Sequence, residues 1–266
     1  MRLTPVVAAL VAASVLLLSG CGADDEDPNA PATTGPPTAG PELRGELTVF
    51  AAASLTGAFD ELAARFEERH PSLDVLPVVY DGSSTLAAQL LEGAPADVFA
   101  AADEDTMQKV TDAGLAADPR AFATNTLVLV MPTGNPGGVE GLSDLADGSV
   151  TAVLCAPEVP CGAASRTLLS RAGVTVTPAS LEQNVTAVLT KVAAGEADAG
   201  LVYATDVLGR EGVESLVPDG AADVVNRYPI ATVADSANPE AARAFADFVL
   251  TGQGQEVLAR HGFGGP

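Results

Sequence analysis

Basic residues are scarce in this chain. Its 266 residues include 13 Lys and Arg against 35 Asp and Glu, which gives a formal net charge of −22. Proteins that bind nucleic acid or an anionic membrane surface by charge need a basic surface, so the composition argues against both partners. A small anion is not excluded, because the local dipoles of a site decide its binding. The ordinary consequence of such acidity is solubility.

A long apolar run is missing at the N-terminus, where Val6 to Leu18 is too short for a comfortable membrane span. Arg2 precedes this run, and Leu18-Ser-Gly-Cys21 ends it. The ending resembles the lipobox of bacterial lipoproteins, in which the Cys is lipidated and becomes the first residue after cleavage. We therefore predict a signal peptide at residues 1–20 and lipidation at Cys21. An ordinary secretory signal is the alternative, and either one means export.

Residues 21–42 are rich in acidic residues and proline. Asp24-Asp-Glu-Asp27 is a run of charge, and five prolines follow it by position 41. Nothing in this stretch can bury apolar area, so we predict a disordered linker. When extended it would hold the folded part on the order of 50 Å from the membrane.

Histidine and cysteine are also rare, with two His and three Cys. Cys155 and Cys161 lie six positions apart, and export favours a disulfide between them. A metal site is the rival, but neither His70 nor His261 is near this pair in the sequence, and we expect no bound metal cation. Two free thiols are the remaining alternative.

The rest of the chain alternates apolar strands with amphipathic helices from Leu43 onward. This alternation predicts an α/β fold with mainly parallel sheet. Two apolar strands, at 125–131 and 228–233, have no helix-opening turn after them. We interpret them as crossovers between two lobes, with residues 43–124 and 232–266 in lobe 1 and residues 125–231 in lobe 2.

Small polar turns follow several of the predicted strands. In such sheets ligands bind outside the carboxyl ends of strands, and helices that begin there offer free N–H groups and about half a positive charge each. Taken singly, each residue is an ordinary cap or core residue; we expect Ser54, for example, to be the N-cap of the first helix. Lys, Arg and His are absent from these turns, so together they favour a buried anion that carries no proton. The turns hold Ser54, Ser83, Ser84, Gly162, Asn184 and Tyr203.

These turns sit in motifs that resemble the periplasmic molybdate-binding proteins of ABC importers. The resemblance covers residues 45–263. The motifs are Val49-Phe-Ala-Ala-Ala-Ser54-Leu-Thr, Gly82-Ser-Ser-Thr-Leu86, Gly93-Ala-Pro-Ala-Asp-Val-Phe99, Pro157-Glu-Val-Pro-Cys-Gly162, Asn184-Val185, Gly200-Leu-Val-Tyr203 and Gly262-Phe263.

The resemblance implies a two-lobe, type II periplasmic-binding-protein fold that closes on its ligand. Its ligand positions fall on Ser54 and Ser83 in the first lobe, and on Cys161, Val185 and Tyr203 in the second. Cys161 and Val185 would bind through their backbone N–H groups. Asp81 departs from the family pattern, and we expect its carboxylate to point to solvent, because an inward carboxylate would oppose the anion.

The function that follows is extracytoplasmic binding of molybdate or tungstate by a lipid-anchored monomer, which delivers the anion to a membrane permease and needs no cofactor. A receptor for sulfate or a small organic anion is the first alternative. A carboxylate ligand would draw on an arginine, and Arg166 is the nearest basic residue to the turns. An exported serine hydrolase is more remote, because no Gly-x-Ser-x-Gly elbow is present and both histidines look like surface residues at helix ends.

Overall fold

The computed structural model describes residues 42–266. The predicted signal peptide, the lipidation site at Cys21 and all but the last residue of the predicted linker 21–42 lie outside this range. Among the described residues, no helix is both long enough and apolar enough to cross a membrane.

Within residues 42–266 the main sheet has nine strands, and most predicted strands are present. A separate two-stranded sheet pairs β1 (Gly45–Leu47) with β3 (Leu73–Val75). The main sheet has the order β4 (Val79–Asp81), β2 (Val49–Ala52), β5 (Val98–Ala100), β11 (Val225–Val233), β6 (Ala116–Pro132), β9 (Ala199–Tyr203), β7 (Ala152–Cys155) and β8 (Ser180–Glu182), with β10 (Val213–Leu216) beside β6.

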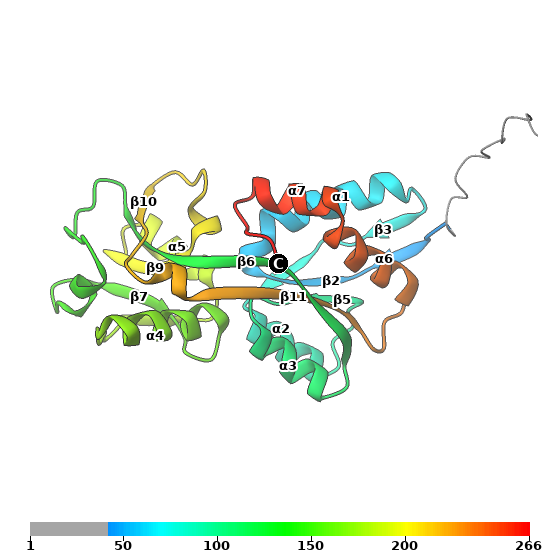
Figure 1. Cartoon of the computed structure of the whole chain (residues 1–266), viewed down its shortest axis with the longest axis horizontal. Helices are drawn as coiled ribbons and strands as arrows, with labels where there is room; N and C mark the ends of the chain where they lie inside the picture. Colours follow the sequence, from blue (N-terminus) through cyan, green and yellow to red (C-terminus); the bar gives the residue numbers. More distant parts are fainter. Residues whose placement is uncertain (1–41) are drawn as a thin grey trace, which may run out of the picture. The chain divides into compact units, whose positions relative to one another are not determined.

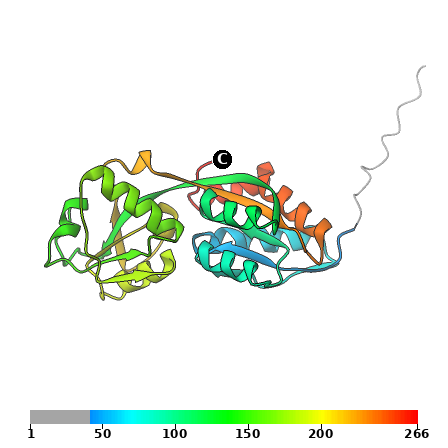
Figure 2. The same ribbon diagram turned by 90° about the horizontal axis from the view of Figure 1, so that it is seen from below.

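The sheet contains two parallel groups joined by antiparallel strands. β2 runs parallel to β4 and β5, and β7 runs parallel to β8 and β9. β6 and β11 pair antiparallel with each other and connect the two groups, as Figures 1 and 2 show. The predicted crossover strands are therefore the structural link between two α/β lobes.

β6 begins at Ala116, nine residues before the predicted strand. The added part, residues 116–124, pairs with β11. Sequence reasoning missed it because Ala117 to Arg120 are exposed and include a proline, so the stretch shows no apolar run or alternation. The short strands β8 and β10, with their exposed residues, were missed for the same reason.

Helices cover both faces of the first lobe. α1 (Thr56–Arg69), α6 (Pro239–Leu250) and α7 (Gly252–Arg260) lie on one face, and α2 (Ser83–Leu91) and α3 (Glu104–Asp112) on the other (Figure 1). Side chains alternate across a strand. Accordingly, Val49 and Ala51 pack in the cluster with α1 and α6, whereas Phe50 packs in the cluster with α2 and α3. On α2, Leu86 and Leu90 are buried, but Leu91 is 52% exposed.

The second lobe carries α4 (Pro160–Ala172) and α5 (Val185–Ala193). The side chain of Asn184 caps α5 by accepting from the N–H of Ala187 at 2.9 Å, so the predicted N-cap is confirmed. α4 ends at Gly173 with φ of 69°, a left-handed conformation that favours glycine. It begins at Pro160, because proline fits the first helical turn.

The predicted N-cap at Ser54 is wrong. A short 3₁₀ turn, η1 (Ala53–Leu55), separates β2 from α1. The Ser54 hydroxyl is therefore free of the helix backbone. A second 3₁₀ turn, η3 (Ala204–Val207), follows β9, and the chain then continues toward β10.

Candidate anion-binding site

A small cavity lies between the two lobes. The volume open to the centre of a water molecule is ≈ 20 Å³, and a single buried water needs about 10–15 Å³ by the same measure. The space therefore suits one compact group rather than an extended organic molecule. Its lining comprises Ala52, Ala53, Ser54, Gly82, Ser83, Ala102, Val159, Pro160, Cys161, Gln183, Asn184, Val185 and Tyr203.

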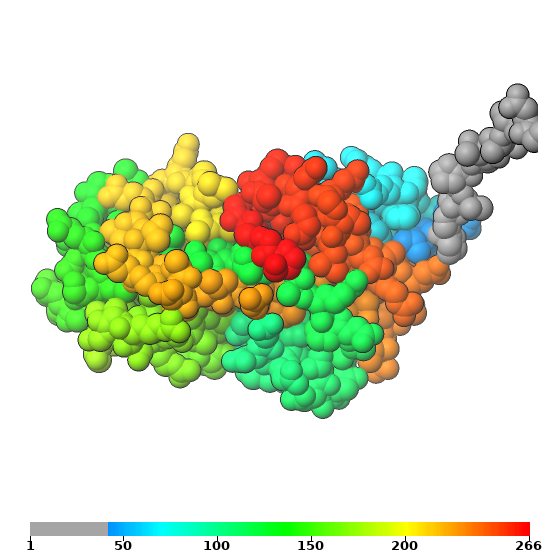
Figure 3. Space-filling model, in the orientation of Figure 1, coloured from blue at the N-terminus to red at the C-terminus, as the bar shows by residue number. Residues whose placement is uncertain are grey.

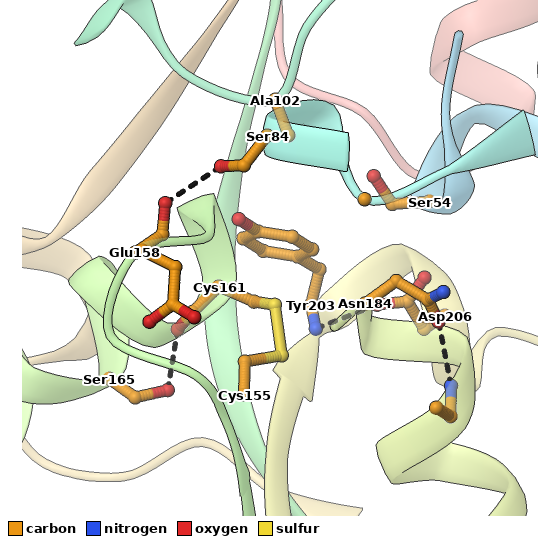
Figure 4. The surroundings of a disulfide bond; sticks show 12 residues. Ser54, Ser84, Ala102, Cys155, Glu158, Cys161, Ser165, Asn184, Tyr203 and Asp206 are labelled. Atoms are coloured by element: carbon orange, nitrogen blue, oxygen red, sulfur yellow. Dashed lines mark hydrogen bonds between the residues drawn. A yellow bond between two sulfur atoms is a disulfide. The ribbon is translucent and has the colours of Figure 1, made fainter. Parts of the chain in front are cut away.

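All five residues predicted as ligands line this one cavity. Two belong to the first lobe, Ser54 in the turn after β2 and Ser83 at the start of α2. Cys161 lies in the first turn of α4, Val185 is the first residue of α5, and Tyr203 ends β9. Figure 4 shows Ser54 facing Tyr203, with Cys161 nearby.

Three helix N-termini meet at the cavity, those of α2, α4 and α5. The N–H groups of a helix's first turn have no intrahelical acceptor, and the aligned peptide dipoles place about half a positive charge there. No Lys, Arg or His belongs to the lining of this cavity in the described chain. The electropositive character of the site therefore comes from backbone dipoles and hydroxyls, an arrangement suited to an anion.

The side chains at the site are arranged to donate hydrogen bonds. Ser83 is 1% exposed, and its Oγ accepts from the N–H of Ala102 at 2.9 Å. The Tyr203 hydroxyl accepts from Nδ2 of Asn226 at 3.0 Å. Because each oxygen already accepts a bond, its own proton is left for an acceptor in the cavity.

A second layer of polar side chains supports the site from the crossover strands. The hydroxyl of Tyr228 on β11 lies 3.0 Å from Oγ of Ser54. Asn125 on β6 donates to that hydroxyl at 3.4 Å and to Oγ1 of Thr205 at 2.8 Å. Sequence reasoning missed these residues and Asn226. The available signal was the presence of asparagines inside apolar strands, since a buried amide needs partners.

Burial perturbs the ionisable groups around the cavity. It raises the pKa values of the Tyr203 and Tyr228 hydroxyls far above their ordinary range, so both remain protonated donors. Burial also raises the pKa of Asp206 to about 7, against the opposing effect of a hydrogen bond from the N–H of Tyr203. That bond, at 2.8 Å, holds the backbone from which the Tyr203 ring projects.

Asp81 does not point to solvent as expected. Its Oδ1 accepts from the N–H of Gly82 at 2.7 Å and from Nδ2 of Asn184, in the other lobe, at 2.8 Å. The carboxylate is held beside the cavity because both of these donors stand at its rim.

A disulfide joins Cys155 and Cys161, which overturns the alternatives of free thiols and a metal site at this pair. It links the end of β7 to the first turn of α4 and closes the loop that contains Val159 and Pro160, two residues of the cavity lining. A Cβ at Gly162 would lie 1.8 Å from the carbonyl oxygen of Ala156, so only glycine fits this turn.

The other chemically active residues lie away from the cavity. His70 and His261 end α1 and α7, as predicted, and His261 lies 3.1 Å from Glu61. Arg166 lines a separate groove on the second lobe. The cavity thus offers neither a base for a serine nucleophile nor an arginine for a carboxylate ligand. Among residues 42–266 there is also no group of three or more His, Cys, Asp and Glu that could hold a metal ion.

Two α/β lobes, joined by crossing strands and enclosing a cavity ringed by helix N-termini, define a binding protein of the two-lobe periplasmic type. The chain belongs to the family of bacterial extracellular solute-binding proteins, whose model matches residues 47–264. The prediction of a binding protein rather than an enzyme is therefore confirmed.

Several known bacterial proteins are similar in sequence to this chain over most of its length. The molybdate-binding protein ModA of Mycobacterium tuberculosis is 41% identical over 260 residues, covering 95% of this chain and 96% of the relative. ModA of Escherichia coli is 32% identical, covering 82% and 89%. The solved periplasmic molybdate-binding protein of Azotobacter vinelandii has the same fold, with a TM-score of 0.72 at 22% identity, covering 83% of this chain and 99% of that one.

Proposed function

We propose that this protein binds molybdate, or tungstate of nearly the same size and charge, outside the cytoplasm and delivers it to the permease of an ABC importer. The observation that carries the proposal is a small cavity between two lobes that offers hydrogen-bond donors but no cationic side chain. Such a site stabilises a fully ionised tetrahedral oxyanion, because neutral donors and helix dipoles replace a counter-charge. The named relatives support molybdate as this anion.

The proposed contacts divide between hydroxyl and backbone donors. Ser54, Ser83 and Tyr203 donate through their hydroxyls. Cys161 and Val185 donate through their N–H groups, which belong to the first turns of α4 and α5 and have no intrahelical acceptor. The anion is then held by both lobes at once, so binding favours the closed arrangement.

The lobe boundaries follow the two crossing strands. We assign residues 43–124 and 232–266 to the first lobe and residues 125–231 to the second, and the antiparallel pairing of β6 with β11 supports this division. We also propose lipid anchoring at Cys21, with the predicted linker 21–42 as the tether of a receptor that stays near its permease. We further propose that the protein acts as a monomer, since one chain supplies all the lining of the cavity.

Sulfate is the second candidate, because it too is a tetrahedral dianion that needs only donors. It is smaller than molybdate, so a closed cavity shaped for molybdate holds sulfate at longer, weaker hydrogen bonds. Selectivity between the two anions then depends on how far the lobes close.

The test is calorimetric titration of the purified mature chain with molybdate, tungstate, sulfate and phosphate. We expect binding of molybdate and tungstate at micromolar concentration or below. A parallel thermal-shift series should show the same order, since a ligand at a hundred times its Kd adds about 2.7 kcal/mol of stability. Binding of sulfate alone would keep the class and change the ligand, and binding of none of the four would refute the proposal.

A further inference from the structure

Among the hydrogen bonds between the two lobes, the one between Asn184 and Asp81 lies beside the cavity. Nδ2 of Asn184, at the start of α5, donates to Oδ1 of Asp81, at the end of β4, at 2.8 Å. The same oxygen accepts from the N–H of Gly82 at 2.7 Å. The other end of the Asn184 amide is occupied as well, because its Oδ1 caps α5 through the N–H of Ala187. Each atom of this bond is therefore fixed from its own lobe.

The neighbouring pair, Gly82 and Gln183, also lies close together across the cleft. A Cβ at Gly82 would lie 2.1 Å from the carbonyl oxygen of Gln183. Gly82 has φ of −57° and ψ of 135°, which any residue can adopt, so its backbone conformation does not require glycine. The absence of a side chain is needed only because the opposite lobe comes so near.

The negative charge of Asp81 lies close to the place proposed for the anion. Gly82 and Asn184 both line the cavity, so the carboxylate that they hold lies close to the proposed anion. A carboxylate in that place weakens anion binding by repulsion unless it also makes a favourable interaction that offsets the repulsion. Its contribution is a charge-assisted hydrogen bond across the cleft, which is stronger than a neutral one.

We propose that Asp81 and Asn184 form a clasp that stabilises the closed arrangement of the lobes, and that the contact of Gly82 with Gln183 is the stop that sets how far they close. Neither Asp81 nor Gln183 needs to touch the anion. The clasp sets affinity by making closure easier, and the stop sets the cavity size that separates larger from smaller oxyanions. This inference rests on the proposed function for its anion but concerns separate residues.

The sharpest test of the clasp is Asn184→Asp. The new side chain keeps an oxygen for capping α5, but it sets a carboxylate against Asp81, so closure becomes unfavourable. Loss of a hydrogen bond to a charged group corresponds to about 10- to 150-fold weaker molybdate binding. The exchanged pair Asp81→Asn with Asn184→Asp restores a donor facing a carboxylate, and its affinity should return to within about threefold of the wild type.

Ser84→Ala is the matched control for the clasp. It also removes a hydrogen bond between the lobes, from Oγ of Ser84 to the carbonyl oxygen of Glu158 at 2.7 Å, but it adds no repulsion (Figure 4). We expect it to weaken binding by no more than about fivefold, as for a neutral bond. An Asn184→Asp variant no weaker than Ser84→Ala, or an exchanged pair no better than Asn184→Asp, would overturn the clasp.

The stop is tested by Gly82→Ala, which is expected to hold the lobes further apart. Small-angle X-ray scattering should give this variant a larger radius of gyration than the wild type when both are saturated with molybdate. The ratio of the Kd for sulfate to that for molybdate should also rise. An unchanged radius together with an unchanged ratio would overturn the stop.

Failure of the clasp can be told apart from failure of the proposed function. If the wild type binds none of the four oxyanions, the function fails, and scattering without any anion still tests the clasp. In that case the wild type should be more compact than Asn184→Asp, and the exchanged pair should be as compact as the wild type. Equal radii for all three proteins would overturn the clasp independently of the ligand.

Discussion

Two buried tyrosines, Tyr203 and Tyr228, differ in whether they line the cavity, and replacing each by Phe separates binding from stability. Tyr203 lines the cavity, whereas Tyr228 lies behind Ser54 and does not. Both side chains are almost fully buried, and each substitution removes a single oxygen. The two variants are therefore matched in burial and in the atom removed, and only Tyr203→Phe changes a residue of the cavity lining.

The structure gives the expected magnitudes. Without the Tyr203 hydroxyl, the Asn226 amide loses one acceptor but still donates to the carbonyl oxygen of Ala102 at 3.0 Å, so the side chain keeps a partner. Without the Tyr228 hydroxyl, Asn125 still donates to Thr205. Each variant should thus lose about 1 kcal/mol of stability. Tyr203→Phe also loses a hydrogen bond to a charged ligand, about 1.5–3 kcal/mol, which corresponds to about 10- to 150-fold in affinity.

The assay is urea unfolding without anion, to compare stabilities, and calorimetric titration with molybdate, to compare affinities. We expect similar unfolding free energies for the two variants and an affinity loss for Tyr228→Phe of no more than about fivefold, because Ser54 keeps its own hydroxyl. Equal losses of affinity, or a larger loss for Tyr228→Phe, would refute the assignment of the Tyr203 hydroxyl as a direct donor.

Three further predictions concern stability as well as binding. Ser83→Ala should lower the free energy of unfolding by about 1–3 kcal/mol in urea, because it leaves the buried N–H of Ala102 without its acceptor, and should also weaken molybdate binding. Replacing Cys155 and Cys161 by Ser should lower stability by about 2–3 kcal/mol, as expected for so short a loop; full stability without the disulfide would contradict this. The raised pKa of Asp206, about 7 against an ordinary 3.8, means that the folded state holds a proton which the unfolded chain has lost, so the free energy of unfolding should fall as pH rises from about 4 to about 7 and level off above that. Asp206 is partly exposed, which moderates the slope, and urea unfolding across this range should show a flatter profile for Asp206→Asn.

The parts of the fold that could be predicted are those in which the local sequence pattern, an apolar run or a capping residue, matches the burial or the hydrogen bonds found in the structure. Apolar runs such as 125–131 are buried strands, and caps such as Asn184 and Asn238 begin helices because a side-chain oxygen satisfies a first-turn N–H. Residues 116–124 could not be predicted, because they form a strand only through pairing with β11, more than 100 residues later. Pairing between segments so far apart in the sequence produces no periodic pattern of apolar residues.

The candidate site shows the same division. The position of the cavity could be predicted because small polar turns follow apolar strands, where an α/β sheet binds ligands. The five residues named for it came from the family resemblance, and all five line the cavity. The support from Tyr228 could not be found, because an aromatic residue in an apolar strand is normally core. The orientation of Asp81 was predicted wrongly. Repulsion by the anion favours a carboxylate that points to solvent, but two donors hold the Asp81 carboxylate beside the cavity. Its actual partner, Asn184, comes from the other lobe, 103 positions away.

The order of strands in the sheet has a consequence for how this chain folds. The first lobe is not built from contiguous sequence, since β11 lies between β5 and β6, and Phe245 of α6 packs against Phe59 and Phe66 of α1. The C-terminal segment also belongs to this assembly, because Gly264 pairs with Thr124 of β6. Figure 3 shows this segment in red on the surface of the molecule. A chain cut before β11 should therefore remain sensitive to proteases, with one edge of β5 and one face of α1 uncovered. Although its first strands emerge early from the ribosome, the first lobe can be completed only after β11 and α6 have been made.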